Sequence, residues 1–169
     1  QIYYSLQARE AEYELIPAGL DQGVGVLVWS PLAGGLLSGK YRRGQGAPEG
    51  SRRLAGWGEP PVRDEDQLYA TIDALVEIAA ARGVSPAQVA LAWLLRKPGI
   101  TSLVIGARTD GQLAANLGAA TLCLSEEEQA RLDAVSAPPL LYPYWHQAAM
   151  AADRLGTADL ALLGPHVHR

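Results

Sequence analysis

The stretch VGVLVWSPLAGGLLSGKY, residues 24–41, decides the fold class of this chain. Its first five residues, 24–28, are apolar without alternation, which is typical of a parallel strand covered by helices on both faces. Trp29, Ser30 and a glycine-rich segment follow directly. Because function in α/β folds sits at the carboxyl ends of such strands, this loop is the first candidate site.

Helical and strand-like patterns alternate on both sides of this stretch. Further strands are predicted at 2–5 and 100–105, and helices are predicted at 8–21, 64–82, 85–95, 109–117, 125–135 and, weakly, 147–155. This order predicts an α/β fold with parallel strands, and with Trp29 and Gly106 at the same end of the sheet. The pattern alone does not distinguish an open sheet from a closed barrel. Residues 30–62 form a long loop, of the kind that is either functional or disordered.

Charge and cysteine content narrow the class of partner. The net charge is −4 and the basic residues are scattered apart from the pairs at 42–43 and 52–53, which argues against a nucleic-acid or anionic-membrane surface. The single cysteine, Cys123, cannot form an internal disulfide, and no window reaches the roughly 18 to 20 apolar residues of a membrane span. We therefore expect a cytoplasmic location and a small molecule or a protein as the partner.

The start of the sequence suggests that more chain precedes it. The only methionine is Met150, and the sequence opens at Gln1 inside a predicted strand. We therefore expect this chain to be the C-terminal piece of a longer protein. Its main part would be residues 1–136, and residues 137–169 would form a tail that packs on it.

The loop after residue 28 combines an aromatic ring, glycines and one cation. Glycines at 34, 35 and 39 let backbone amides approach a ligand, and Lys40 adds a mobile positive charge. Trp29 would present its face to a flat ring such as nicotinamide. Each feature has a structural alternative: Trp29 as a core residue, Lys40 as solvated surface, and the glycines as a flexible turn.

The second candidate loop, residues 106–116, follows the predicted strand at 100–105. Thr109 starts a helix whose first N–H groups point back at the loop, and Arg108 places a guanidinium beside them. A helix terminus next to an arginine suits a phosphate group. The alternative is that Arg108 is only a charge at the helix end.

Four segments together resemble one enzyme family. They are QIYYSL at 1–6, WSPLAGGLLSGKY at 29–41, SPAQVALAWLL at 85–95 and VIGARTDGQLAANLGA at 104–119. In order and spacing they are similar to the C-terminal half of an aldo-keto reductase, of the branch resembling the potassium-channel β subunits. The resemblance covers residues 1 to about 136. It implies a partial (β/α)8 TIM barrel, of which this chain supplies about strands six to eight, and reduction of carbonyls with NADPH.

The resemblance also implies a cofactor site. Gln1 would bond the nicotinamide carboxamide, Trp29 would stack on the nicotinamide ring, and Arg108 would contact the 2′-phosphate. The other implied positions are Ser30, Pro31, Leu32 and Gly34 facing the pyrophosphate, Lys40 and Arg52 along the strap over the cofactor, Gly106 leading into the second loop, and Gln112 and Asn116 on the adenine side. Ala115 departs from the family, which often has Glu beside that asparagine.

The family's catalytic Asp, Tyr, Lys and His come from the first strands of the barrel. Nothing in this chain matches them, so neither a catalytic nor a metal-binding residue is predicted. We expect the chain to carry the cofactor half-site of a carbonyl reductase and to be inactive without the missing N-terminal half of the barrel. Its small-molecule substrate would be an aldehyde or a ketone.

Two other functions stay open at this level. One is an NADPH-binding regulatory or sensor subunit that resembles the channel β subunits, and the other is an independent small α/β module. Two roles are open for the aromatic tail segment at 142–146. It would either contribute to the substrate pocket or dock against the outer helices.

Overall fold

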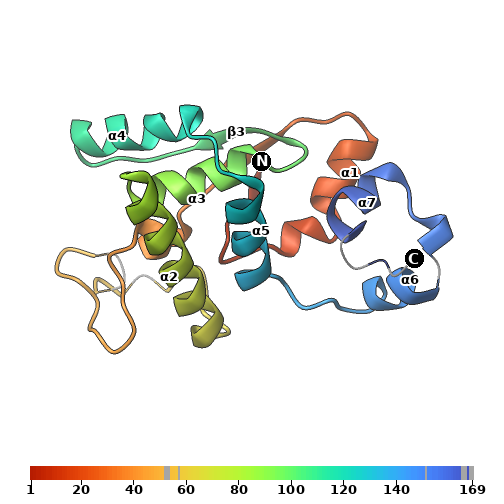
Figure 1. Ribbon diagram of the computed structural model, residues 1–169, viewed down its shortest axis with the longest axis horizontal. Coiled ribbons are helices and arrows are strands. Elements are labelled where there is room, and N and C mark those ends of the chain that lie inside the picture. Colours follow the sequence, from red (N-terminus) through yellow and green to blue (C-terminus); the bar gives the residue numbers. More distant parts are fainter. Residues whose placement is uncertain (52–53, 57, 151, 165–166, 168–169) are drawn as a thin grey trace.

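The computed structural model describes residues 1–51, 54–56, 58–150, 152–164 and 167 (Figure 1). The strands are β1 (Ile2–Tyr3), β2 (Val26–Trp29) and β3 (Ile100–Val104). The α-helices are α1 (Leu15–Asp21), α2 (Glu65–Arg82), α3 (Pro86–Leu95), α4 (Asp110–Leu117), α5 (Glu126–Val135), α6 (Tyr144–Met150) and α7 (Thr157–Leu163). Short 3₁₀ turns are η1 (Glu10–Glu12), η2 (Ala33–Ser38), η3 (Gly118–Thr121) and η4 (Ala152–Arg154).

The strands form a parallel sheet in the order β1-β2-β3. Tyr3 lies opposite Trp29, and Trp29 lies opposite Val104. The register puts the end of β2 and the start of the Gly106 loop at the same edge, so the predicted strand direction and the shared end are both confirmed. This is the parallel part of an α/β fold.

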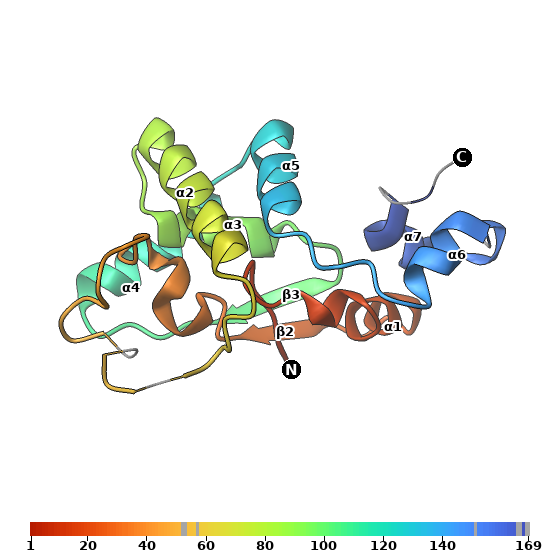
Figure 2. The same ribbon diagram turned by 90° about the horizontal axis from the view of Figure 1, so that it is seen from below.

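Among the described residues, helices cover one face of the sheet. Figure 2 shows the strands along one side of the molecule, with α2, α3 and α5 on the other. Val26 and Val28 are buried under these helices, whereas Leu27, Trp29 and Val104 on the opposite face are 42%, 39% and 49% exposed. The prediction that the strand at 24–28 is covered by helices on both faces is therefore wrong for this structure. The apolar run is real, but helices pack on only one side of it.

The predicted helix at 8–21 is also wrong in its first half. The structure replaces it with η1 and the shorter helix α1, which begins at Leu15. Pro17 explains the difference, because proline has no N–H and its ring clashes with the carbonyl four residues earlier in a helix interior. In α1 Pro17 lies in the first turn, where that N–H is not needed.

Helix starts agree with their sequence signals. Ser85 and Ser125 each accept from the amide three residues on, and Gln88 and Glu128 close both capping boxes. Among the described residues no single helix is long and apolar enough to cross a membrane. The pair α2 and α3 reaches the length and apolar composition of a membrane span only when the two helices are taken together, and a 100° bend separates them. In the tail, α6 and η4 overlap the weakly predicted helix at 147–155, and the pattern did not predict α7.

A buried polar network joins the segment after β1 to α3 and α5. The Arg9 guanidinium donates to both Glu12 carboxylate oxygens at 2.8 and 2.9 Å, and the Tyr4 hydroxyl donates to the same carboxylate. Arg9 also donates to the Asp133 carbonyl and the Ser136 hydroxyl of the α5 region, both at 2.9 Å. The Trp93 ring of α3 lies 5.3 Å from the guanidinium carbon. Each charged group in the network is therefore paired.

Replacing Arg9 with alanine should destabilise the fold strongly. Loss of the guanidinium leaves the Glu12 carboxylate buried without its counter-ion, a change that costs about 3 to 5 kcal/mol. Arg63→Ala is the matched control, because the Arg63–Glu10 pair is exposed and its loss should cost less than about 1 kcal/mol. Urea unfolding of both variants measures the difference. Equal losses would contradict the role given to the buried network.

Candidate functional site

The two predicted loops meet at the carboxyl ends of β2 and β3. Figures 1 and 2 both place the loop that follows η2 at the same end of the molecule as α4. The Arg108 guanidinium, just before α4, donates to the Gly50 carbonyl of that loop at 3.2 Å. The structure therefore brings together segments that are more than fifty residues apart.

Trp29 is not a core residue. Its indole is 39% exposed and packs edge to face against Tyr3, with ring centroids 4.6 Å apart and planes at 84°. Both rings line a cavity of about 730 Å³ at this end of the sheet. Trp29 thus presents an aromatic surface next to an open volume.

The turn after Trp29 has an unusual backbone. Ser30 and Ala33 have φ of 54° and 51°, and Gly34 and Gly35 have φ of 65° and 98°. The Ala33 and Gly35 amides donate to the Ser30 and Leu32 carbonyls, both at 2.9 Å, and the Gly34 amide donates to the Ser30 hydroxyl at 3.3 Å. These amides are therefore already engaged within the turn. A pyrophosphate there would share the Gly34 amide with Ser30.

Lys40 lies beside this turn. A Cβ placed on Gly35 would lie 3.4 Å from the Lys40 amine, which is exposed and makes no ion pair within the described part of the chain. The amine is 5.3 Å from the centre of the Tyr41 ring. Gly39 holds the backbone against the first turn of α3, since a Cβ there would come within 2.5 Å of Pro86. Lys40 therefore lies next to the glycines of the loop, on a backbone that packs against α3.

The α4 end of the site is exposed. Thr109 accepts from the Gln112 amide at 3.2 Å, as predicted for the first residue of a helix. The Gln112 side-chain oxygen, however, accepts a hydrogen bond from the Arg108 amide at 2.9 Å. This oxygen is therefore already bonded to the loop before α4.

The remaining predicted positions lie around these two loops. Gln1 is exposed just before β1, Pro31 is buried, Leu32 and Asn116 are half-buried, and Gly106 is exposed after β3. Arg52 lies outside the described residues. Of the predicted set, Trp29 is the one that lines the cavity.

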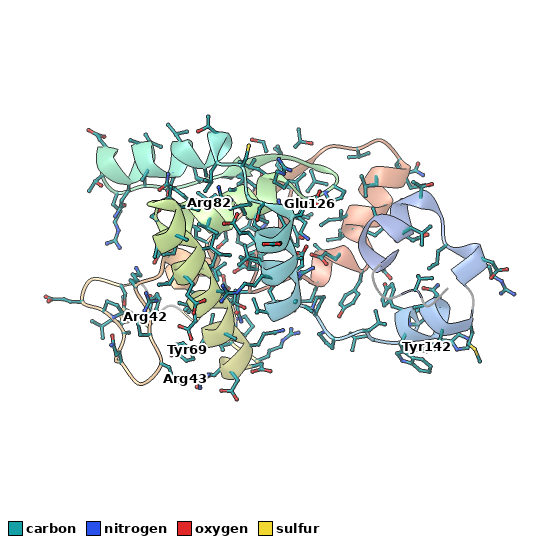
Figure 3. The ribbon with its side chains drawn as sticks, in the orientation of Figure 1. Arg42, Arg43, Tyr69, Arg82, Glu126 and Tyr142 are labelled. Carbon is teal, nitrogen blue, oxygen red and sulfur yellow. The ribbon has the colours of Figure 1, made fainter. Side chains whose placement is uncertain are left out.

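The loop between η2 and α2 is fastened to α2 by Arg43. Its guanidinium lies 2.7 Å from the Asp66 carboxylate and 5.0 Å from the Tyr69 ring centre, and Figure 3 shows Arg43 and Tyr69 near each other. This contact and the Arg108 bond to Gly50 hold the long loop from two sides. Both contacts lie on the surface, and they connect the described part of the loop to α2 and to the segment before α4.

The cavity was not predicted from the sequence. Its wall combines Tyr3, the segment 6–10, Tyr13, loop residues 59–61, 63 and 64, and the start of the tail at 136–139 and 141. The Arg63 guanidinium and the Glu10 carboxylate form an exposed ion pair at 3.0 Å between two of these segments. One signal was available, because Tyr3 follows Gln1 by two residues, and side chains two apart in an extended segment lie on the same face. The tail contribution depends on a distant contact that no local pattern contains.

Burial changes the titration of Tyr3. Desolvation raises the pKa of the Tyr3 phenol, the nearby Ser30 hydroxyl offsets part of that rise, and the Glu59 and Glu10 charges add to it. Among the described residues the buried Tyr3 hydroxyl has no hydrogen-bond partner within bonding geometry.

The tail docks on α1. Tyr144 stacks on Tyr13 with ring centroids 4.9 Å apart, the Tyr13 hydroxyl donates to the Pro139 carbonyl, and α7 packs against α1. Tyr142 and Trp145 stay 72% and 50% exposed, and Figure 3 shows Tyr142 in this tail region. Of the two proposed roles for residues 142–146, docking on an outer helix is the one the contacts favour.

Within the part of the chain that the structure describes, no group of three or more His, Cys, Asp or Glu is arranged to hold a metal ion.

Comparison with known proteins identifies the family. The model of the Aldo/keto reductase family matches residues 1–137. The uncharacterized oxidoreductase YrpG of Bacillus subtilis is 36% identical over 73% of this chain and 36% of its own length. Protein tas of Escherichia coli is 36% identical over 78% of this chain and 38% of its own length. The chain belongs to the aldo/keto reductase family.

The chain is also similar to a channel subunit and to a solved enzyme structure. A probable voltage-gated potassium channel subunit beta of Arabidopsis thaliana is 33% identical over 69% of this chain and 36% of its own length. The crystal structure of the thermostable aldo-keto reductase Tm1743 with the inhibitor epalrestat matches with a TM-score of 0.55 and 29% identity, over 80% of this chain and 38% of that chain. The chain thus spans a little over a third of the length of these relatives.

The anchoring of the Lys40 loop can be tested with two glycines. Gly39 and Gly44 have φ of 80° and 73°, so alanine at either position should cost about 1 to 2 kcal/mol in backbone strain. Gly39→Ala should cost about 1 to 3 kcal/mol more, because its methyl group meets Pro86 whereas nothing lies within 4 Å of Gly44. Thermal unfolding compares the two. A Gly44→Ala loss as large as that of Gly39→Ala would show that the loop does not pack on α3 in this way.

Proposed function

We propose that this chain is the cofactor-binding C-terminal part of an NADPH-dependent aldo-keto reductase that reduces aldehydes or ketones to alcohols. The observation that carries the proposal is the meeting of two loops at the carboxyl ends of β2 and β3, tied by the Arg108 bond to Gly50 at 3.2 Å. Family membership supports it. Trp29, at the same end of the sheet, supplies an exposed aromatic surface.

The residues present fit a nicotinamide dinucleotide. Trp29 offers a flat face, and the exposed amine of Lys40 lies beside the Gly35 turn. Arg108 places a guanidinium next to the first turn of α4, where the backbone dipole also favours an anion. Asp110 in that turn opposes part of this attraction. The fit is therefore strongest at the ring and at a phosphate near Arg108.

The roles of the chain's own residues follow from these positions. Trp29 would orient the ring, Lys40 would neutralise charge on the diphosphate, and Arg108 would bind the 2′-phosphate. When bound, the cofactor supplies a hydride to the carbonyl carbon. The proton donor is proposed to lie in the part of the barrel that this chain does not contain.

We also propose that the missing strands of a (β/α)8 barrel are the partner of this chain, which would supply strands six to eight. The uncovered sheet face exposes Leu27 and Val104, at 42% and 49%. Leu113 and Leu117 lie four residues apart on one face of α4 and are 42% and 59% exposed. Apolar groups at these positions suit burial against further strands and helices of a closed barrel.

A regulatory or sensor subunit that binds NADPH is the second candidate. The similarity to the probable channel subunit of Arabidopsis thaliana, at 33% identity, favours it. Both candidates use the same cofactor site. They differ in whether the upstream sequence supplies the family's Asp, Tyr, Lys and His.

Arg108 should decide which cofactor binds. Arg108→Ala should weaken NADPH binding roughly 10- to 150-fold, the value of one charge-assisted hydrogen bond of about 1.5 to 3 kcal/mol, and should leave NADH nearly unchanged. Lys40→Ala is the contrast, because a charge beside the diphosphate affects both cofactors alike. Fluorescence quenching gives both dissociation constants. Equal losses for NADPH and NADH in Arg108→Ala would remove this residue from the 2′-phosphate site.

The chain by itself should not turn over carbonyl substrates. No residue in it matches the family's proton donor or the Lys and Asp that support it. NADPH absorbance should therefore stay constant when the purified chain is mixed with an aldehyde, while a complete aldo-keto reductase in the same assay consumes NADPH. Steady turnover above a no-protein control would show that catalytic residues lie within these 169 residues.

A further inference from the structure

Tyr3 and Trp29 form one unit across two neighbouring strands. They are register partners in β1 and β2, and their rings are perpendicular at a centroid distance of 4.6 Å. Both line the cavity at the carboxyl end of the sheet. Perpendicular aromatic pairs are favourable because the positive edge of one ring meets the negative face of the other. The contact therefore favours one orientation of each ring.

Trp29 has limited support from its own strand. The next residue, Ser30, has φ of 54°, so the backbone leaves the extended conformation directly after Trp29. The indole is also 39% exposed, which leaves part of its surface without a packing partner. Tyr3 is the described aromatic ring in contact with it. The orientation of the indole thus depends on a residue in another strand.

Tyr3 acts here through its ring. Its hydroxyl is buried, lies near the Ser30 hydroxyl and has no hydrogen bond of normal geometry among the described residues, and burial raises the pKa of the phenol. A protonated, shielded hydroxyl contributes neither charge nor a bond to Trp29. The ring contact is the interaction that remains.

We propose that Tyr3 is a positioning residue that holds the Trp29 indole in the orientation needed to stack on the nicotinamide ring. The inference rests on the proposed function, because it assigns Tyr3 to the same cofactor site. It concerns only the nicotinamide end of that site. Arg108 and α4 belong to the other end.

The test compares two ligands in the 169-residue chain. NADPH carries the nicotinamide ring, and adenosine 2′,5′-bisphosphate carries the 2′-phosphate and adenine without it. Tyr3→Leu should weaken NADPH binding about three- to ten-fold, the value of one aromatic contact, and leave the bisphosphate unchanged. Tyr3→Phe keeps the ring and should bind both ligands as the parent chain does. Calorimetric titration of the three proteins gives the constants.

Four results would overturn the inference. Equal weakening of both ligands in Tyr3→Leu would mean a general structural role, and unchanged NADPH binding would mean no role. If the parent chain binds the bisphosphate but NADPH no more tightly, Tyr3 has no nicotinamide to position, while the phosphate end of the site survives. If it binds neither ligand, the proposed function fails and the inference with it.

A second measurement does not depend on the folding of a variant. In the parent chain with labelled tyrosine rings, NADPH should shift the ring signals of Tyr3, whereas adenosine 2′,5′-bisphosphate should not. Tyr142, which is 72% exposed in the tail and is not among the residues that line the cavity, is the internal control. Shifts of Tyr3 with both ligands, or with neither, would contradict the positioning role.

Discussion

The buried charge of Arg9 is the constraint on which the arrangement of this chain depends. Burial alone would lower the pKa of Arg9, but the Glu12 carboxylate outweighs that effect and the net pKa is raised, so the guanidinium is charged in the core. A charged group in the interior must be paired, and Arg9 finds its partners in Glu12 and in the Asp133 and Ser136 region of α5. The segment after β1 therefore cannot move independently of α5. Through Trp93 it is also held to α3.

This network fixes the position of the candidate site. Tyr4, which donates to Glu12, is the neighbour of Tyr3, so the same short segment that is locked into the core places Tyr3 on the opposite face beside Trp29. The tail joins on the other side through Tyr13 and Tyr144 and completes the cavity wall. The second loop is tied in by Arg108. The site is thus supported by the buried Arg9 network at one end and by the exposed contacts of Arg108 and Arg43 at the other.

Short sequence patterns predicted those features of the fold that are determined by residues close together in the chain. The helices predicted at 85–95 and 125–135, the parallel direction of the strands and the shared end of Trp29 and Gly106 follow from short patterns, and the structure confirms them. The family was also identified from four motifs, and the comparisons confirm it. A residue's role toward the cofactor stays a prediction for every predicted position.

Features set by distant contacts could not be predicted. The strands are buried on one face only, and an apolar run such as 24–28 does not record which of its faces has a neighbour. Pro17 did carry a usable signal against the helix at 8–21, but helical spacing on both sides of it outweighed that signal. The cavity needs the tail, whose docking rests on a ring contact between Tyr13 and Tyr144. No periodicity links residues so far apart in the chain.

Hydrogen exchange with and without NADPH tests the central claim most directly, that these loops form one cofactor site. The account predicts slower exchange of backbone amides in residues 29–35 and 106–112 together, with little change in the amides of α2, which lies in the core. It also predicts a smaller effect in the second segment with NADH, which lacks the 2′-phosphate. Unchanged exchange in both segments, or protection confined to the tail, would contradict it.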